Sequence, residues 1–432
     1  MLIIVQNLPV PLDRRVWLEC RALRDAGYEV SVICPKGPGD PGYEVLDGVH
    51  LYKYRPAPPT SGVLSYLVEF GYCWLRTAWL SLRVARRRRF DVLQACNPPD
   101  TYWALALLWR LRGVHFVFDQ HDLNPEVFLS RFGTPSGLAG RVQLAGVRWL
   151  ERRTYRTARH VISTNESYRR IAHTRGGVPE GATTVVRSGP DTTRMRPVRP
   201  VTELRNGRAH LLAYLGIMGP QDGVDVVLRA ADILVHELGL DVQVALLGFG
   251  DSYDDLVALA SELKLDDHVT FTGRADLRMI AEYLSTADVG LSPDPRNPLN
   301  DVSTMNKTME YMAFALPVVA FDLTETVVSG GDAALYVSAD EPLDDAVRRF
   351  ALAVAELLAD PARRAEMALA GRRRAERVLD WQPQRRAYVS VFDRITGRLS
   401  ELPEPAALPP GGADEWGHEL VDVTDDDAVR AF

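Results

Sequence analysis

The sequence predicts an α/β protein with two doubly wound parallel-sheet domains. The chain has 432 residues, too many for one hydrophobic core, and this length corresponds to two domains of about 200 residues each. Short apolar strands alternate with amphipathic helices from Leu2 onward. The alternation stops in a Pro- and Arg-rich stretch and starts again at Leu211, which indicates a second domain.

These breaks in the pattern define the expected domain limits. We expect a first domain over residues 1–195, a linker over 196–208 and a second domain over 209–380. A further helix is expected over 381–400. Residues 401–432 are acidic and rich in Pro and Gly, so we expect a mostly disordered tail with Trp416 as a docking point.

Composition excludes several functional classes. The chain is 46% hydrophobic and 25% charged, as in ordinary globular proteins, and its net charge of −7 argues against nucleic-acid binding. Its four cysteines form no CxxC pair, so we expect free thiols in a reducing, cytoplasmic compartment. Met1 leads directly into a strand, so no signal peptide is expected. We also expect neither a metal site nor a cofactor.

The N-terminal segment reads as strand, helix, strand. Leu2–Val5 is a buried strand, a helix follows from about Asp13 to Ala26, and Tyr28–Cys34 is the next strand. The first loop lacks a glycine-rich phosphate cradle. The charged group at 13–15 would either face a binding cleft or form a solvated helix start, and the second reading is favoured.

Residues 63–90 predict a long amphipathic helix. Glu69, Arg76 and Arg83 recur every seven residues and form a narrow polar stripe among aromatic and aliphatic residues. Charges in the middle argue against a transmembrane span. The Arg86–Arg89 run leaves two readings open, a helix lying on an anionic membrane surface through 63–89 or a core helix with a solvated basic end.

Polar residues follow the predicted strand Phe116–Asp119. The string FDQHDLNPE places His121 and Asp122 directly after it. Sites in parallel α/β sheets form at the carboxyl ends of strands, so both residues are candidate catalytic groups.

The stretch SPDPRNPLNDVSTMNKTMEYMAFALPVVAFDL predicts an anion site. A short strand ends at Leu291, and a helix is expected to start near Ser303 or Thr304. The start of such a helix favours an anion. Lys307 and Glu310 lie three residues apart on one face, where the lysine suits a phosphate and the carboxylate can accept two sugar hydroxyls.

The segment MNKTMEYMAFALPVVAFD resembles the donor-site helix of GT-B glycosyltransferases of the family-4 type. In that family two glutamates stand eight positions apart, and the second, which matches Glu310, holds the nucleotide ribose. The first would fall at Val302 and is missing, which leaves Asp301 or Asp294 as stand-ins. FDQHDLNPE resembles the family motif whose histidine approaches the transferred sugar, which implies this role for His121.

The resemblance also implies the architecture: two Rossmann-like domains facing across a cleft, with the helix at 381–400 crossing back to the first domain. Two further departures concern phosphate binding, because relatives carry glycines in the first loop and an Arg and a Lys near 218–223, all absent here. Phosphate binding then depends on backbone N–H groups, Lys307 and Arg274. The other donor-site candidates are Gly216, Asn306 and Gly248, which begins a turn that lies beside the nucleobase in relatives.

The resemblance implies a retaining, metal-independent transferase that uses a nucleoside-diphosphate sugar. The similar proteins make bacterial surface polysaccharides, so the expected acceptor is a growing or lipid-linked glycan, at the inner face of the cytoplasmic membrane. Two alternatives stay open: a GT-B nucleotide-sugar epimerase, and a non-catalytic scaffold that has lost donor binding.

Overall fold

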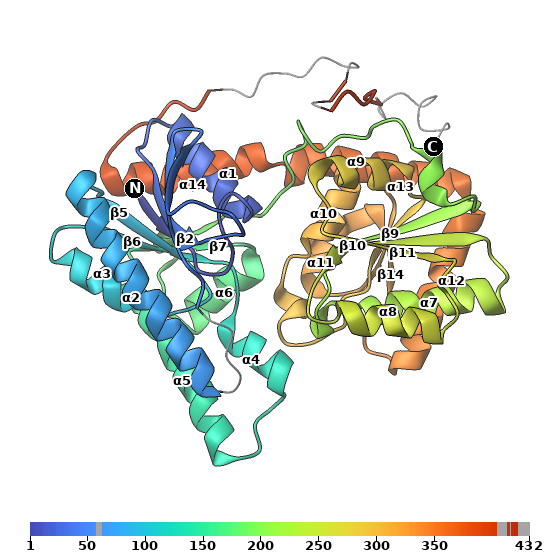
Figure 1. The fold of residues 1–432 in the computed structure, drawn as a ribbon, viewed down its shortest axis with the longest axis horizontal. Coiled ribbons are helices and arrows are strands. Elements are labelled where there is room, and N and C mark those ends of the chain that lie inside the picture. Colours follow the sequence, from blue (N-terminus) through green and yellow to red (C-terminus); the bar gives the residue numbers. More distant parts are fainter. Residues whose placement is uncertain (58–62, 404–412, 415, 422–432) are drawn as a thin grey trace. The chain divides into compact units, whose positions relative to one another are not determined.

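The computed structural model of the chain describes residues 1–57, 63–403, 413–414 and 416–421 (Figure 1). The chain forms two compact units. Of the described residues, the first unit contains 1–57, 63–188 and 382–403, and the second contains 189–381, 413–414 and 416–421.

The first unit is built on an eight-stranded sheet with the order β3-β4-β2-β1-β5-β6-β7-β8. All neighbouring strands are parallel except the β3–β4 hairpin. The strands are β1 (Leu2–Ile4), β2 (Ser31–Pro35), β3 (Tyr43–Leu46), β4 (Val49–Tyr54), β5 (Val92–Cys96), β6 (His115–Gln120), β7 (His160–Ser163) and β8 (Thr183–Val185).

Helices connect these strands, as expected for a doubly wound sheet. They are α1 (Arg14–Asp25), α2 (Val63–Arg87), α3 (Trp103–Arg110), α4 (Asn124–Phe132), α5 (Leu138–Thr157) and α6 (Glu166–Thr174), and the last helix of the chain, α14 (Trp381–Thr396), also packs on this unit. Apolar residues of α2, α3 and α5 belong to one buried cluster with side chains of β1, β2 and β4–β7, so these three helices cover the same face of the sheet (Figure 1).

The C-terminal helix α14 belongs to the first unit although it follows the second in sequence. Tyr388 donates a hydrogen bond to Gln94 of β5 (2.6 Å), and Arg385 forms an ion pair with Asp25 of α1 (2.8 Å). These two contacts attach the helix to the first sheet.

The second unit has a six-stranded, fully parallel sheet with the order β11-β10-β9-β12-β13-β14. Its strands are β9 (His210–Ile217), β10 (Val242–Phe249), β11 (Val269–Gly273), β12 (Val289–Ser292), β13 (Val318–Phe321) and β14 (Ala334–Val337). Its helices are α7 (Val224–Asp232), α8 (Tyr253–Glu262), α9 (Leu277–Thr286), α10 (Asn306–Ala313), α11 (Thr324–Gly330), α12 (Leu343–Ala359) and α13 (Pro361–Arg374).

The strand orders locate the binding edges. The first sheet extends from β1 through β2 to the β3–β4 hairpin, and the second extends from β9 through β10 to β11. The chain then returns to the opposite side of the starting strand at β5 and at β12. Ligands of open parallel sheets bind at the carboxyl edge at such switch points. The candidate ligand-binding edges are therefore the carboxyl ends of β1 and β5 and those of β9 and β12.

The division between the units differs from the expected limits of 195 and 209. Residues 189–195 belong to the second unit, because the buried Arg372 of α13 donates to the carbonyl oxygens of Thr192 and Met195, while Asp380 accepts from Thr192. A polar, proline-rich composition does not reveal such contacts.

Part of the expected disordered tail is ordered. Leu420 pairs with Val198, and His418 contacts Glu282 of α9 at 2.9 Å. Trp416, the expected docking residue, is 37% exposed. Residues 404–412, 415 and 422–432 lie outside the described range.

The structure also bears on the expectations for the cysteines and for a membrane-spanning helix. All four cysteines are buried and free, as predicted. Among the helices that the structure describes, none combines the length and the apolar character needed to cross a membrane.

Candidate functional site

The helix that carries the predicted donor residues begins later than expected. The helix α10 starts at Asn306, not near Ser303 or Thr304, because residues 300–302 form a separate 3-10 turn. The side chain of Asn300 fixes this turn by donating to the carbonyl oxygens of Gln221 (2.8 Å) and Pro295 (2.9 Å). Neither expected residue caps the helix, since its N-cap position is Met305.

Tyr311 attaches α10 to the switch point. Its hydroxyl accepts the N–H of Leu215 in β9 (2.8 Å) and donates to the carbonyl oxygen of Leu291 in β12 (3.0 Å). Gly290 permits this close approach, since a Cβ there would lie 2.6 Å from the tyrosine ring. The first turn of α10 is therefore held at the β9/β12 edge.

Lys307 is a buried cation at this edge. Its side chain is 9% exposed, and its Nζ lies 2.5 Å from an oxygen of Asp294, whose side chain is 2% exposed. The ammonium also lies over the ring of Tyr214, 5.3 Å from its centroid. Burial alone would lower the pKa of Lys307, but Asp294 and Asp222 outweigh it and the pKa is raised, so the lysine stays charged.

Two strand-end glycines keep the neighbouring backbone close. A Cβ on Gly248 would lie 1.8 Å from the carbonyl oxygen of Gly216. A Cβ on Gly216 would lie 3.2 Å from the Cε atom of Lys307, and the residue has φ +159°. A side chain at Gly216 would fill the space beside the lysine, and one at Gly248 would clash with the backbone of Gly216, so both glycines keep the strand ends close together at the edge where an anion would bind.

The other predicted donor residues are placed differently from one another. Glu310 lies one turn after the lysine, is 9% exposed and shares the helix face that meets the sheet edge. Asn306 is exposed at the helix start. Arg274 follows β11, and its guanidinium stacks 4.9 Å from the ring centroid of Phe249, which is exposed at the end of β10.

Asp301 is committed to structural contacts. It pairs with Arg296 and accepts hydrogen bonds from the N–H (3.1 Å) and hydroxyl (3.0 Å) of Thr324 at the start of α11. Asp294, the other stand-in for the missing glutamate, is the partner of Lys307. Lys307, Glu310, Gly216 and Gly248 therefore lie at one sheet edge. Asp301 instead holds the loop before α10 in place through its contacts with Arg296 and Thr324.

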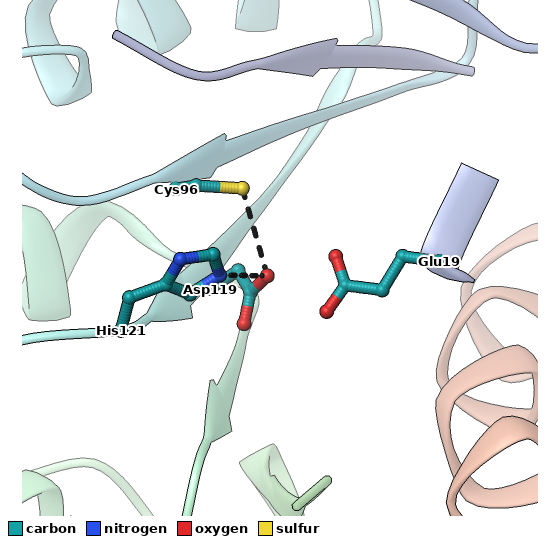
Figure 2. Close-up of side chains that lie close together, drawn as sticks. All are labelled: Glu19, Cys96, Asp119 and His121. Carbon is teal, nitrogen blue, oxygen red and sulfur yellow. Dashed lines mark hydrogen bonds and ion pairs between the residues drawn. The ribbon is translucent and has the colours of Figure 1, made fainter. Parts of the chain in front are cut away.

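The first unit has a polar cluster at the carboxyl ends of β5 and β6 (Figure 2). The Nε2 of His121 lies 2.8 Å from Asp119. Arg15 of α1 reaches the same carboxylate at 3.0 Å and also lies 3.0 Å from Glu19. The amide of Gln94 donates to both Glu19 and Asp119, each at 2.9 Å.

The charges of this cluster fix the histidine. Burial alone would raise the pKa of Asp119, but Arg15 and His121 lower it far below its usual value, so it is ionised. Arg15 is 3.1 Å from Nε2 as well, but one nitrogen cannot donate to Asp119 and accept from Arg15. Whichever of these two contacts it makes, Nε2 is engaged within the cluster, and Nδ1 is the nitrogen left to act on a ligand.

The pKa of Glu19 is shifted in the opposite direction from that of Asp119. Burial and the neighbouring Asp119 raise the pKa of Glu19 well above the usual range, so Glu19 holds a proton while Asp119 stays ionised beside Arg15. Glu19, Cys96, Asp119 and His121 offer ligand atoms within 4.8 Å of one another, close enough for a metal ion. The guanidinium of Arg15 already contacts three of them and supplies the cation.

Asn97 fixes the backbone around the predicted catalytic pair. Its Oδ1 accepts the N–H groups of His121 (2.7 Å) and Asp122 (3.1 Å). Burial raises the pKa of Asp122, and it raises that of the neighbouring Asp100 to about 6 even though Asn124 and Asn97 donate to it. With these N–H groups engaged, His121 can offer its ring Nδ1 and its main-chain carbonyl.

Several members of this cluster were not predicted from the sequence. Arg15 was favoured as part of a solvated helix start, and that was wrong, since its side chain is 8% exposed. Glu19 stands among the apolar positions of α1, and Gln94 interrupts the apolar run of β5. A charged or amide side chain at such positions is a signal that could have found them.

Sequence comparison decides which family these two units belong to. Residues 12–189 match the profile of the glycosyl transferase 4-like domain, and residues 209–392 match that of the glycosyl transferases group 1. The chain belongs to the group 1 glycosyltransferases. It is an enzyme with the GT-B fold that uses a nucleotide-sugar donor. The epimerase and scaffold alternatives are not favoured.

Individual glycosyltransferases align over most of the chain. A phosphatidyl-myo-inositol mannosyltransferase of Mycolicibacterium smegmatis is 27% identical over 399 residues, which cover 90% of this chain and 92% of that protein. The sucrose-phosphate synthase of Thermosynechococcus elongatus has a TM-score of 0.72 at 19% identity, covering 92% and 98% of the two chains. Anabaena HepE, solved with UDP-glucose, has a TM-score of 0.65 at 15% identity, covering 91% and 99%.

Proposed function

We propose that the enzyme transfers a sugar with retention of anomeric configuration, without a metal ion, to a lipid-linked or growing surface glycan. The observation that carries the donor site is the buried, charged Lys307 beside Gly216 at the β9/β12 edge. There the lysine and backbone N–H groups hold the diphosphate, and Glu310 accepts the ribose hydroxyls. Arg274, which stacks on Phe249 at the end of β10, is the second cation proposed for the phosphates, and the turn that begins at Gly248 lies beside the nucleobase.

The proposed reaction is a single exchange at the anomeric carbon. The bond from that carbon to the β-phosphate oxygen breaks with its electron pair leaving on the diphosphate. The acceptor oxygen bonds to the same face, and its proton passes to the leaving phosphate. His121, oriented by Asp119, faces the positive charge that develops on the sugar with its neutral ring or main-chain carbonyl.

Metal independence follows from how the leaving diphosphate is neutralised. In the proposed site the charge of Lys307 and the dipoles of backbone N–H groups take the place of a divalent ion. We therefore expect turnover to be insensitive to a chelator.

One set of measurements tests this function. Thermal stabilisation by UDP-, GDP-, ADP- and dTDP-sugars identifies the donor, because a ligand that binds the folded state raises its melting temperature. NMR of the product with that donor then reports the anomeric configuration. We expect the donor's configuration and unchanged turnover with EDTA. An inverted product or a loss of turnover on chelation would contradict the proposed reaction.

We propose that α2 brings the enzyme to an anionic membrane. Its inward face is buried through Cys73, Leu80 and Val84, so the helix is also a core helix. Its outward face exposes Leu75 (65%) and Trp79 (50%). The polar stripe of the sequence flanks this apolar ridge, because Arg76 and Arg83 both stack on Trp79.

Liposome binding tests this contact. Arginines near an anionic surface each contribute about 1 kcal/mol of attraction, and the term weakens with salt. Changing Arg86–Arg89 to Gln should therefore abolish most co-sedimentation with anionic liposomes at low salt. A parent enzyme that stays in the supernatant would remove the support for a lipid-linked acceptor.

A further inference from the structure

We propose that the outer face of α5 binds the phosphate of an anionic membrane lipid headgroup. The site would hold the transferase at the membrane that carries its proposed acceptor. The proposal rests on the proposed function only through this lipid-linked acceptor. It lies on a different helix from the α2 ridge, and its residues are distinct from those of both sheet edges.

A hollow runs along one face of α5. Its volume is about 420 Å³, and it is lined by residues spaced three or four apart, which places them on one stripe of the helix: Arg141, Leu144, Ala145, Arg148, Trp149 and Arg152. Leu144 is 8% exposed and forms an apolar floor. Trp149 packs edge-on against Trp103 of α3, with ring centroids 5.6 Å apart, so this wall is fixed. A shaped hollow with apolar and cationic walls suits an amphiphilic anion.

The three arginines of the hollow are exposed. Within the part of the chain that the structure describes, they form no ion pair. The one acidic residue of α5, Glu151, is buried and paired with Arg175 at 2.6 Å. Arg148 and Arg152 stand four residues apart, where like charges repel and destabilise a helix. A bound phosphate would relieve this repulsion, and the guanidinium fork can grip it with two parallel hydrogen bonds.

Apolar side chains next to the hollow favour a lipid over a soluble anion. Leu138 and Val142, on the same helix, are 80% and 62% exposed, and Phe132 at the end of α4 is 66% exposed. Cationic residues beside exposed apolar ones are typical of a helix that lies in a membrane interface. The protein as a whole has a net charge of −7, so the positive charge along α5 is a local feature of this surface.

The test compares parent enzyme and a triple variant, Arg141→Gln, Arg148→Gln and Arg152→Gln, on vesicles of phosphatidylcholine with and without phosphatidylglycerol. The loss of three arginines should weaken binding to the anionic vesicles on the order of a hundredfold. A matched control changes three exposed arginines elsewhere, Arg170, Arg373 and Arg377, to Gln and should bind like the parent. Equal binding by the triple variant and the parent would overturn the proposal.

Two further arms separate a headgroup site from its alternatives. A triple Arg-to-Lys variant keeps the charge but loses the fork, and it should bind more weakly than the parent. Parent-like binding would mean diffuse attraction and would contradict a headgroup site. Calorimetric titration with inorganic pyrophosphate should show no binding that depends on these arginines. Such binding would identify a soluble diphosphate instead of a lipid.

Folding and donor binding are followed separately. The triple variant should melt like the parent and keep its stabilisation by nucleotide sugars, because α5 lies in the other unit from Lys307. The two proposals can fail independently. If no nucleotide sugar stabilises the enzyme but vesicle binding still depends on these arginines, the proposed function is refuted and the lipid site remains supported.

Discussion

Changing Lys307 and Asp294 together should distinguish the contribution of Lys307 to donor binding from its contribution to fold stability. The two side chains are 9% and 2% exposed and their charged atoms are 2.5 Å apart. Breaking a buried pair from one side typically costs about 3–5 kcal/mol, since the remaining charge is unpaired, whereas replacing both charges is often close to neutral. Lys307→Met should therefore destabilise the enzyme strongly, and Lys307→Met with Asp294→Asn should restore most of that loss.

Donor affinity should not recover in the double variant. A hydrogen bond to a charged group contributes about 1.5–3 kcal/mol, which corresponds to about a tenfold to a hundredfold change in the dissociation constant. Calorimetric titration with UDP, GDP, ADP and dTDP measures this, and Asp294→Asn alone should bind at least as tightly as the parent. A double variant that folds and binds the nucleotide like the parent would refute the role of Lys307.

Three other outcomes follow from the two sheet edges. Glu310→Ala should weaken donor binding at least tenfold, because the ribose hydroxyls lose a charged acceptor, and parent-like nucleotide affinity would show that the ribose lies elsewhere. His121→Ala should lower turnover while nucleoside-diphosphate affinity stays nearly intact, whereas an equal loss of both would indicate a structural histidine. Burial raises the pKa of Asp100 to about 6, so the folded state favours its protonated form, and the contribution of Asp100 to the free energy of unfolding should fall by about 3 kcal/mol as pH rises from about 4 to about 6. Asp100→Asn should remove this slope from melting temperatures measured across that range, and an unchanged slope would assign it to another group.

The fold could be predicted because its signals are local. Apolar strands alternating with helices specify a doubly wound sheet, and the expected helix at 13–26 is found as α1, with Asp13 accepting from Val16 and Gly27 at φ +77°. The β3–β4 hairpin escaped prediction although it had a signal. Asp47 and Gly48 both have positive φ, as the favoured two-residue hairpin turns require.

The missed features depend on contacts between distant segments. Arg15 is buried because β6 brings Asp119 to it, and the sequence near residue 15 contains only the local partner Glu19, four residues later on α1. The start of α10 moved because Asn300 binds a carbonyl oxygen of the loop before α7. Local capping preferences predict where a helix can begin, but such a tertiary contact decides where it does begin.

A structure of the enzyme with a bound nucleoside diphosphate tests the donor assignment most directly. We predict the β-phosphate at the Nζ of Lys307 beside the backbone of Gly216, with the ribose hydroxyls on Glu310. Nucleotide bound away from the carboxyl edge of β9 and β12, with Lys307 still paired only to Asp294, would contradict the account.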